Sequence, residues 1–149
     1  MNSNVWIDVS CMRFPFKGIC TGGRPRPQHL HQAQAGGVTS VISLCAPSER
    51  TDFDEGELVR TLGMRYLNIP VAGPSDLNLK NAKVLADALD EARGSPVFVH
   101  CASGNRVGAL FALKARLIDG HAIEESLVAG RSAGLTTLEP EVRGILAGL

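Results

Sequence analysis

Two residues capable of joint chemistry, Cys101 and Arg106, lie close together in the chain and are joined by the small or polar residues Ala102, Ser103, Gly104 and Asn105. A cysteine thiolate is a strong nucleophile, and a guanidinium group is a planar set of donors suited to phosphate-like anions. Backbone amides of a short loop can bind the same anion, and glycine permits the positive φ that such a loop needs. The segment therefore predicts a nucleophilic, anion-binding loop.

The nucleophile must be ionised to be useful, and an ordinary cysteine is only a few per cent thiolate at neutral pH. A helix dipole typically supplies less than about 1 kcal/mol of the stabilisation required, so the loop amides and Arg106 must provide the rest. We expect Cys101 to be a thiolate. The alternative is a buried cysteine that ends a strand beside a capping arginine.

The elements around this loop are read from hydrophobic periodicity and from Pro and Gly positions. A short apolar strand, 96–100, precedes the loop, and a helix, 106–118, follows it. Elsewhere the sequence predicts helices at 28–35, 54–62, 79–93, 122–129 and 138–146, strands at 38–44 and 64–69, and loops at 45–53 and 70–78.

Strands that alternate with helices predict an α/β fold with a mainly parallel central sheet flanked by helices. The strand 38–44 is apolar on both faces at its centre, which is typical of an interior strand. With no repeat or linker, we expect residues 1–149 to form a single domain. Ligands of such sheets bind where strands turn into helices, which is where Cys101 lies.

Composition excludes several classes of function. Fifteen basic and fifteen acidic residues cancel, so we expect no general binding of nucleic acid or of anionic membranes. The start of the chain lacks a leader pattern and no stretch is long enough to span a membrane, which favours a cytoplasmic protein. Cys11, Cys20 and Cys45 are expected to be small buried residues, and His29 and His31 are spaced wrongly to share a metal. We expect no metal and no cofactor.

The chain resembles the dual-specificity-like protein phosphatases, within the tyrosine phosphatase superfamily, and among them the bacterial beta-lactamase-hydrolase-like "phosphatase-like" domain family. The resemblance covers most of the chain and is carried by residues 21–25 (TGGRP), 37–44 (GVTSVISL), 66–71 (YLNIPV) and 99–106 (VHCASGNR). It implies the cysteine-dependent phosphatase fold, Cys101 as nucleophile, His100 as a residue that steadies the loop, and Arg106 as the group that binds the transferred phosphoryl.

Three features depart from the family pattern. Phosphatase loops place five residues between Cys and Arg, whereas four occur here, as in the rhodanese sulfurtransferases, which carry a persulfide. Val107 stands where phosphatases have Ser or Thr. Ala72 and Gly73 stand where the aspartic general acid is expected, so Asp76 is the nearest substitute, with helix capping as its alternative role. Asp52 and Asp54 are weaker candidates.

These observations favour hydrolysis of a phosphomonoester through a cysteinyl-phosphate on Cys101, with His100, the loop residues 102–105 and Arg106 binding a small anionic substrate. The alternatives are persulfide transfer from a sulfane-sulfur donor through Cys101, and a non-catalytic anion-binding module. Arg24, Arg50 and Arg131 are expected to be surface or packing residues.

Overall fold

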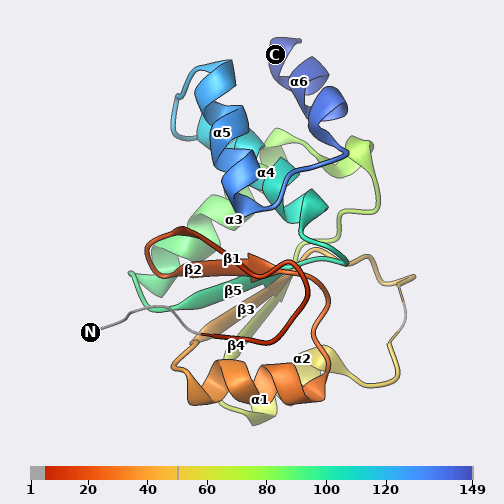
Figure 1. Ribbon diagram of the computed structural model, residues 1–149, viewed down its shortest axis with the longest axis vertical. Coiled ribbons are helices and arrows are strands. Elements are labelled where there is room, and N and C mark those ends of the chain that lie inside the picture. Colours follow the sequence, from red (N-terminus) through yellow and green to blue (C-terminus); the bar gives the residue numbers. More distant parts are fainter. Residues whose placement is uncertain (1–5, 50, 149) are drawn as a thin grey trace.

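The computed structural model describes residues 6–49 and 51–148 and contains one five-stranded sheet between two layers of helices (Figure 1). The strand order is β1 (Arg13–Phe16), β2 (Ile19–Gly22), β5 (Val97–His100), β3 (Ser40–Ser43) and β4 (Arg65–Asn68). β1 pairs with β2 in antiparallel fashion, and the other pairings are parallel. The predicted fold class, a mainly parallel α/β sheet with β3 inside it, is confirmed.

The register of the parallel strands brings their carboxyl ends to one level. His100, the last residue of β5, pairs with Gly22 of β2 on one side and with Ser43 of β3 on the other. Ser43 in turn pairs with Asn68 of β4. The segments that follow these strands therefore meet at one edge of the sheet, and Cys101 is at the centre of that edge.

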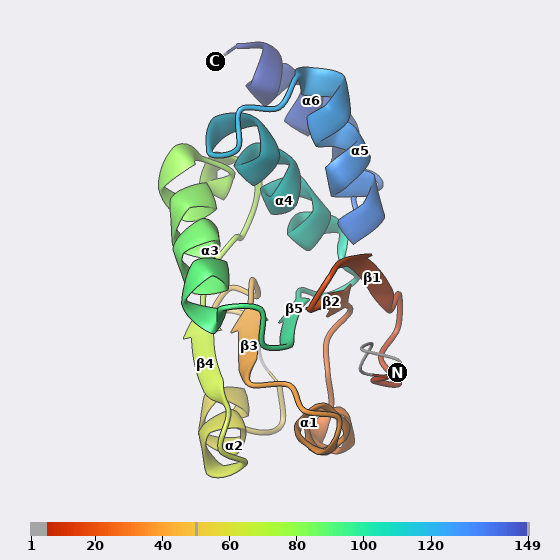
Figure 2. The ribbon, with the colours of Figure 1, turned by 90° about the vertical axis from the view of Figure 1, so that its left-hand side faces the viewer.

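Helices cover both faces of the sheet (Figures 1 and 2). Two helices, α1 (Pro27–Ala35) and α2 (Glu55–Thr61), lie on one face. The opposite face is covered by α3 (Leu79–Ala92), α4 (Asn105–Leu117), α5 (Ile123–Ala133) and α6 (Glu139–Ala147), and a short 3-10 turn, η1, spans Pro74–Asp76.

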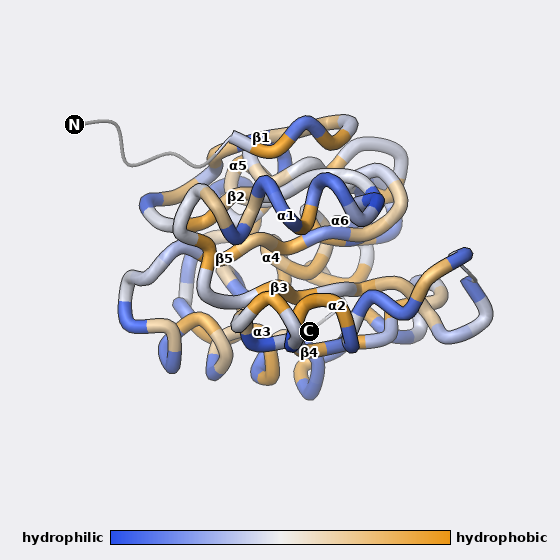
Figure 3. The backbone as a smooth tube through the Cα atoms, turned by 90° about the horizontal axis from the view of Figure 1, so that it is seen from below, coloured by the Kyte–Doolittle hydropathy of each residue, from blue (hydrophilic) through white to orange (hydrophobic). Residues whose placement is uncertain are grey.

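The core is divided into two parts by the sheet, because successive strand residues face opposite sides. In β5, Val97 and Val99 pack with the larger cluster under α3 to α6, whereas Phe98 packs with the cluster under α1 and α2. Figure 3 shows hydrophobic residues along β3, β5 and α4, and alternating hydrophobic and hydrophilic residues on α1. Helix α4 is buried over most of its length, so the helix that starts at the predicted loop is fixed by the core.

The structure differs from the sequence predictions in several places. The β1–β2 hairpin was not predicted from the sequence. Pro15 interrupts the first strand, and the second strand has only three residues before it ends at Gly22. The helix predicted at 79–93 forms, and its first residue, Leu79, is 56% exposed. The residues 1–5 that carried the leader argument, and Arg50, lie outside the described residues.

No helix in the described part of the chain is long and apolar enough to cross a membrane. Within residues 6–49 and 51–148 no group of three or more His, Cys, Asp or Glu side chains is arranged to hold a metal ion.

Candidate functional site

The predicted loop connects β5 to α4. Cys101 follows the last residue of β5, and its amide donates to the carbonyl of Gly22 in the neighbouring strand at 3.3 Å. Gly104 is the N-cap of α4 and has φ +90, so the positive φ expected at this glycine is confirmed. A non-glycine residue would be strained there. The chain therefore turns from strand to helix within four residues.

The sulfur of Cys101 lies inside this turn. Its residue is 1% exposed, and the Gly104 amide donates to Sγ at 3.1 Å. The amides of Ala102 and Ser103 make no hydrogen bond to any other described residue, and both residues are exposed. Together with the start of α4, these amides form a concentration of unused donors next to the sulfur.

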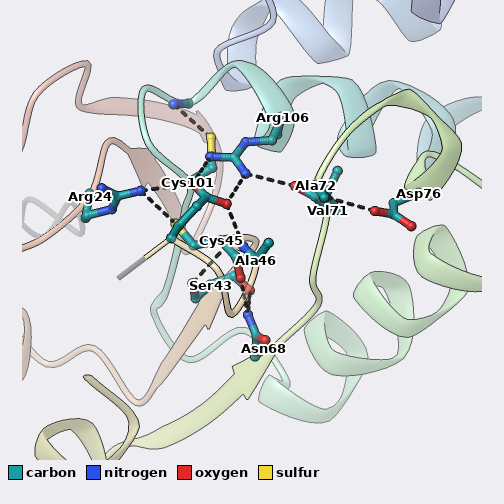
Figure 4. Close-up of polar contacts among 12 residues, drawn as sticks. Arg24, Ser43, Cys45, Ala46, Asn68, Val71, Ala72, Asp76, Cys101 and Arg106 are labelled. Atoms are coloured by element: carbon teal, nitrogen blue, oxygen red, sulfur yellow. Dashed lines mark hydrogen bonds and ion pairs between the residues drawn. The ribbon is translucent and has the colours of Figure 1, made fainter. Parts of the chain in front are cut away.

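Two acceptors hold the Arg106 side chain in place, and they use only some of its N–H donors. Nη1 and Nη2 donate to the two carboxylate oxygens of Glu49, at 2.6 and 2.7 Å, and Nη1 also donates to the carbonyl of Val71 at 2.8 Å (Figure 4). A guanidinium has five N–H donors. Two of these, on Nε and on the adjacent side of Nη2, have no acceptor among the described residues and form one edge, which is the geometry that binds two anion oxygens.

Glu49 is a site residue that the sequence analysis missed. Its carboxylate accepts from Arg24 Nη2 at 2.9 Å and from the Ala46 amide at 2.6 Å, in addition to Arg106. The Arg106 guanidinium is the main reason that the pKa of Glu49 falls to about 2. Glu49 is thus ionised at any pH at which the protein is studied, and it fixes two arginines. Arg24, expected to be a surface or packing residue, is half-buried within this ion-pair network.

His100 is fully buried beneath the loop, and its Nε2 lies 2.6 Å from a carboxylate oxygen of Glu55. Burial, the largest influence, lowers the pKa of His100. Interactions with the Cys45 sulfur and the Glu55 carboxylate outweigh burial and raise it to about 9. The imidazole therefore carries a positive charge at neutral pH and sits one residue before Cys101, where it ties the loop to α2.

Asn105 supports the loop from the other side through its side chain. Oδ1 accepts from the amides of Thr136 and Leu138, at 2.9 and 3.3 Å, and Nδ2 donates to Thr137 Oγ1 at 2.7 Å. The substrate-binding role predicted for Asn105 can therefore involve only its backbone while these bonds persist. The side chain joins the loop to the segment between α5 and α6.

Asp76 does not approach the sulfur in this structure. Its carboxylate accepts from the Ala72 amide at 2.8 Å, and Figure 4 shows it beyond Val71 and Ala72 as seen from Arg106. It does not cap α3 through its side chain, because Asn78 fills that role by accepting from the Asn81 amide. Of the weaker candidates, Asp52 is exposed and Asp54 caps α2.

The remaining sequence predictions are confirmed for some residues and wrong for others. Val107 is fully buried in the core, and Arg131 of α5 pairs with Glu139 of α6. Among the cysteines expected to be buried, Cys20 is buried, but Cys11 is exposed and Cys45 is only half-buried. The prediction was wrong for these two because each lies outside a strand, in a turn or a loop.

Comparison with solved structures identifies the architecture. A candidate phosphatase (DUF442) from Shewanella putrefaciens CN-32 superposes with a TM-score of 0.71 at 22% identity, covering 95% of this chain and 91% of that one. Tk-PTP in its active form gives a TM-score of 0.72 at 18% identity, with coverage of 93% and 95%. The chain has the fold of the protein tyrosine phosphatases. TpbA of P. aeruginosa, solved with phosphotyrosine, shares it as well, with a TM-score of 0.65, 17% identity and coverage of 99% and 92%.

At these levels of identity the comparison extends to the tyrosine phosphatase fold and no further. No family model matches the chain, and no curated protein matches it. The catalytic assignment must therefore come from the site itself.

Proposed function

We propose that this protein is a cysteine-dependent phosphatase that hydrolyses a phosphomonoester through a cysteinyl-phosphate on Cys101. The proposal rests mainly on the free Nε–Nη2 edge of Arg106 in the same loop as a buried cysteine. The fold of the tyrosine phosphatases and the sequence resemblance to the beta-lactamase-hydrolase-like phosphatase-like domains support it.

Phosphoryl transfer needs positioning and charge stabilisation more than it needs covalent assistance from additional groups. In the proposed first step the Cys101 thiolate attacks phosphorus, the S–P bond forms, and the P–O bond to the alcohol breaks. The free edge of Arg106 and the amides of Ala102 and Ser103 bind the equatorial oxygens. Water then attacks the cysteinyl-phosphate, which releases inorganic phosphate and restores the thiolate.

The departing alcohol needs a proton, and Asp76 is our proposed donor. The Asp76 carboxyl group must break its hydrogen bond with the Ala72 amide and turn toward the loop. Residues 70–78 must therefore rearrange before the phosphoryl transfer. Val71 accepts a hydrogen bond from Arg106 through its carbonyl, so Arg106 links the proposed anion site to this segment.

The short loop shapes the expected substrate. Four residues between Cys101 and Arg106 leave one amide fewer than a phosphatase loop offers, and the Gly104 amide is already directed at the sulfur. We therefore propose a larger share of the binding for Arg106. Because TpbA was solved with phosphotyrosine, phosphotyrosine belongs among the first substrates to test, beside phosphoserine and a small aryl phosphate.

The decisive experiment compares two reactions on the purified protein, p-nitrophenyl phosphate in one and thiosulfate with cyanide in the other. We expect phosphate release, no thiocyanate, and a rapidly quenched intermediate whose mass is increased by one phosphoryl group on the tryptic peptide that contains Cys101. Cys101→Ser should abolish both the phosphate release and the intermediate, and Cys20→Ser is the matched control because Cys20 is buried elsewhere.

Other outcomes identify the alternatives. Thiocyanate production without phosphate release, together with an extra sulfur atom on Cys101, would replace the phosphatase with a persulfide carrier. Tight binding of phosphate with turnover in neither reaction would identify an anion-binding module.

A further inference from the structure

Cys45 lies beside the Cys101 loop and takes no part in the reaction proposed above. It is the second residue after β3, whose last residue, Ser43, pairs with His100 of β5. The Cys45 backbone is fixed, because its amide donates to Ser43 Oγ at 3.2 Å and Asn68 Nδ2 donates to its carbonyl at 2.9 Å. Its side chain lines a cavity of about 530 Å³ that is shared with Arg24 and Tyr66, so small molecules can reach it.

Positive groups approach the Cys45 sulfur from two elements. Arg24 Nη2 lies 3.9 Å from Sγ, a contact drawn in Figure 4. From β5, the fully buried His100 lowers the pKa of the Cys45 thiol, and its Nδ1 has no hydrogen-bond partner among the described residues. The other ring nitrogen is taken by Glu55. His100 therefore has one buried polar atom left over, next to a thiol.

The charges of this cluster favour a thiolate. Burial, the largest influence on Cys45, raises its pKa, but His100 and Arg24 outweigh burial, and the net result is a lowered pKa despite the opposing charge of Glu49. Arg106 also faces Cys45 with a positive charge, and the Tyr66 hydroxyl is neutral near pH 7 because its pKa is raised to about 12. An ionised Cys45 is thus paired with an imidazolium and a guanidinium, as reactive cysteines are.

We propose that Cys45 is a second nucleophilic thiol and a site of covalent modification by small electrophiles that enter its cavity. With hydrogen peroxide, the thiolate attacks one oxygen, an S–OH bond forms as the O–O bond breaks, and the other oxygen leaves as hydroxide, which the buffer acid protonates to water. The sulfur is oxidised to a sulfenic acid while the peroxide is reduced. The modified side chain would occupy the cavity and separate Arg24 from the sulfur.

Peptide-resolved alkylation tests the site independently of the proposed phosphatase reaction, because it can be done on the Cys101→Ser protein. Trypsin leaves Cys20 and Cys45 in one peptide, residues 18–50, because Arg24 and Arg26 are both followed by proline, so fragment-ion spectra must assign the label to one cysteine or the other. Lowering the pH from 8 to 6.5 should slow iodoacetamide labelling of Cys45 by a smaller factor than labelling of N-acetylcysteine, which should slow about 20-fold to 30-fold. Cys20 is the internal negative control, because burial raises its pKa to about 12.

Variants and a second reagent complete the test. Arg24→Gln should slow labelling of Cys45 at pH 6.5 at least threefold, and Arg65→Gln, at an exposed site on β4, should not. Peroxide followed by dimedone should place the dimedone mass on Cys45 and not on Cys20. The proposal is overturned if Cys45 follows the pH dependence of N-acetylcysteine, if Arg24→Gln leaves its rate unchanged, or if Cys45 is labelled only after denaturation.

Discussion

Glu49 and Arg106 face one another as a two-point ion pair, with Oε2 2.6 Å from Nη1 and Oε1 2.7 Å from Nη2. The carboxylate comes from the loop after β3 and the guanidinium from the start of α4. The ion pair therefore joins two segments that meet at the carboxyl edge of the sheet. It occupies the end of the guanidinium and leaves the Nε side free. Glu49 thereby orients Arg106 without occupying the edge for which we propose anion binding.

Glu49→Gln should reduce kcat/KM for p-nitrophenyl phosphate roughly 10-fold to 100-fold, because Arg106 and Arg24 lose the charge that fixes them and misplacement of a binding group is costly. Steady-state kinetics would show it, with Glu57→Gln, an exposed substitution on α2, as the control. A positioning role also requires that phosphate inhibition weakens. Stronger inhibition would mean that Glu49 blocks the anion site.

Cys101→Ser should abolish phosphate release, by at least about 10³-fold, since the covalent intermediate can no longer form at sulfur. Circular dichroism should show an unchanged fold, because serine is smaller than cysteine at this buried site. Activity that persists in this variant would show that the nucleophile lies elsewhere.

Asp76→Asn tests the proposed acid with little structural change, because an amide oxygen can still accept from the Ala72 amide. For phenyl phosphate, whose leaving group needs a proton, kcat should fall about 10²-fold or more, and less for p-nitrophenyl phosphate. Asp52→Asn is the matched control, on the other loop. Equal, small effects on both substrates would remove Asp76 from the mechanism.

The ion pair between His100 and Glu55 should make stability depend on pH in a defined direction. The pKa of His100 is raised from 6.5 to about 9, so the stabilisation is fully present below pH 6.5 and is lost as the pH rises through about 9. Glu55→Gln should therefore lower the free energy of unfolding by about 1 to 3 kcal/mol at pH 6.5. Urea titrations at pH 6.5 and 9.5 should show this deficit shrinking at the higher pH, whereas a constant deficit would exclude the charged pair.

Two helical glycines should respond oppositely to alanine. A Cβ at Gly108 in α4 would lie 2.0 Å from the Leu135 amide nitrogen, whereas one at Gly144 in α6 meets nothing within 4 Å. Gly108→Ala should destabilise the fold by at least about 2 kcal/mol, and Gly144→Ala should stabilise it by about 0.5 to 1 kcal/mol. Thermal unfolding of both proteins would check the close approach of α4 to the segment after α5.

Periodicity and turn residues were sufficient to predict the parallel strands β3, β4 and β5 and the position of Cys101 and Arg106 at the carboxyl edge of the sheet. Local patterns determine each of these elements, and one rule about ligand sites in α/β sheets connects them. The same rule would have indicated Arg24 if β2 had been recognised, since Arg24 follows that strand by two residues. The presence of Pro15 and the shortness of both hairpin strands concealed it.

Glu49 could not be predicted in the same way. It lies in an irregular loop, 57 residues from Arg106 in sequence, and no periodic pattern fixes where such a loop places its side chains. The pairing of His100 with Glu55 is similar, because it depends on how α2 packs under the sheet. Long-range polar pairs of this kind require the tertiary structure.

Asn105 bonds to three consecutive residues between α5 and α6, and this has a consequence for how the protein tolerates change at its end. Residues 134–148 are far from Cys101 in sequence. Their first turn nevertheless supports the start of α4, which carries Arg106. Shortening the protein by removal of α6 would disturb that brace, so activity should be lost before the sheet itself is affected. Residues 134–148 would thus contribute to the proposed reaction by holding Arg106 in place, without contacting the substrate.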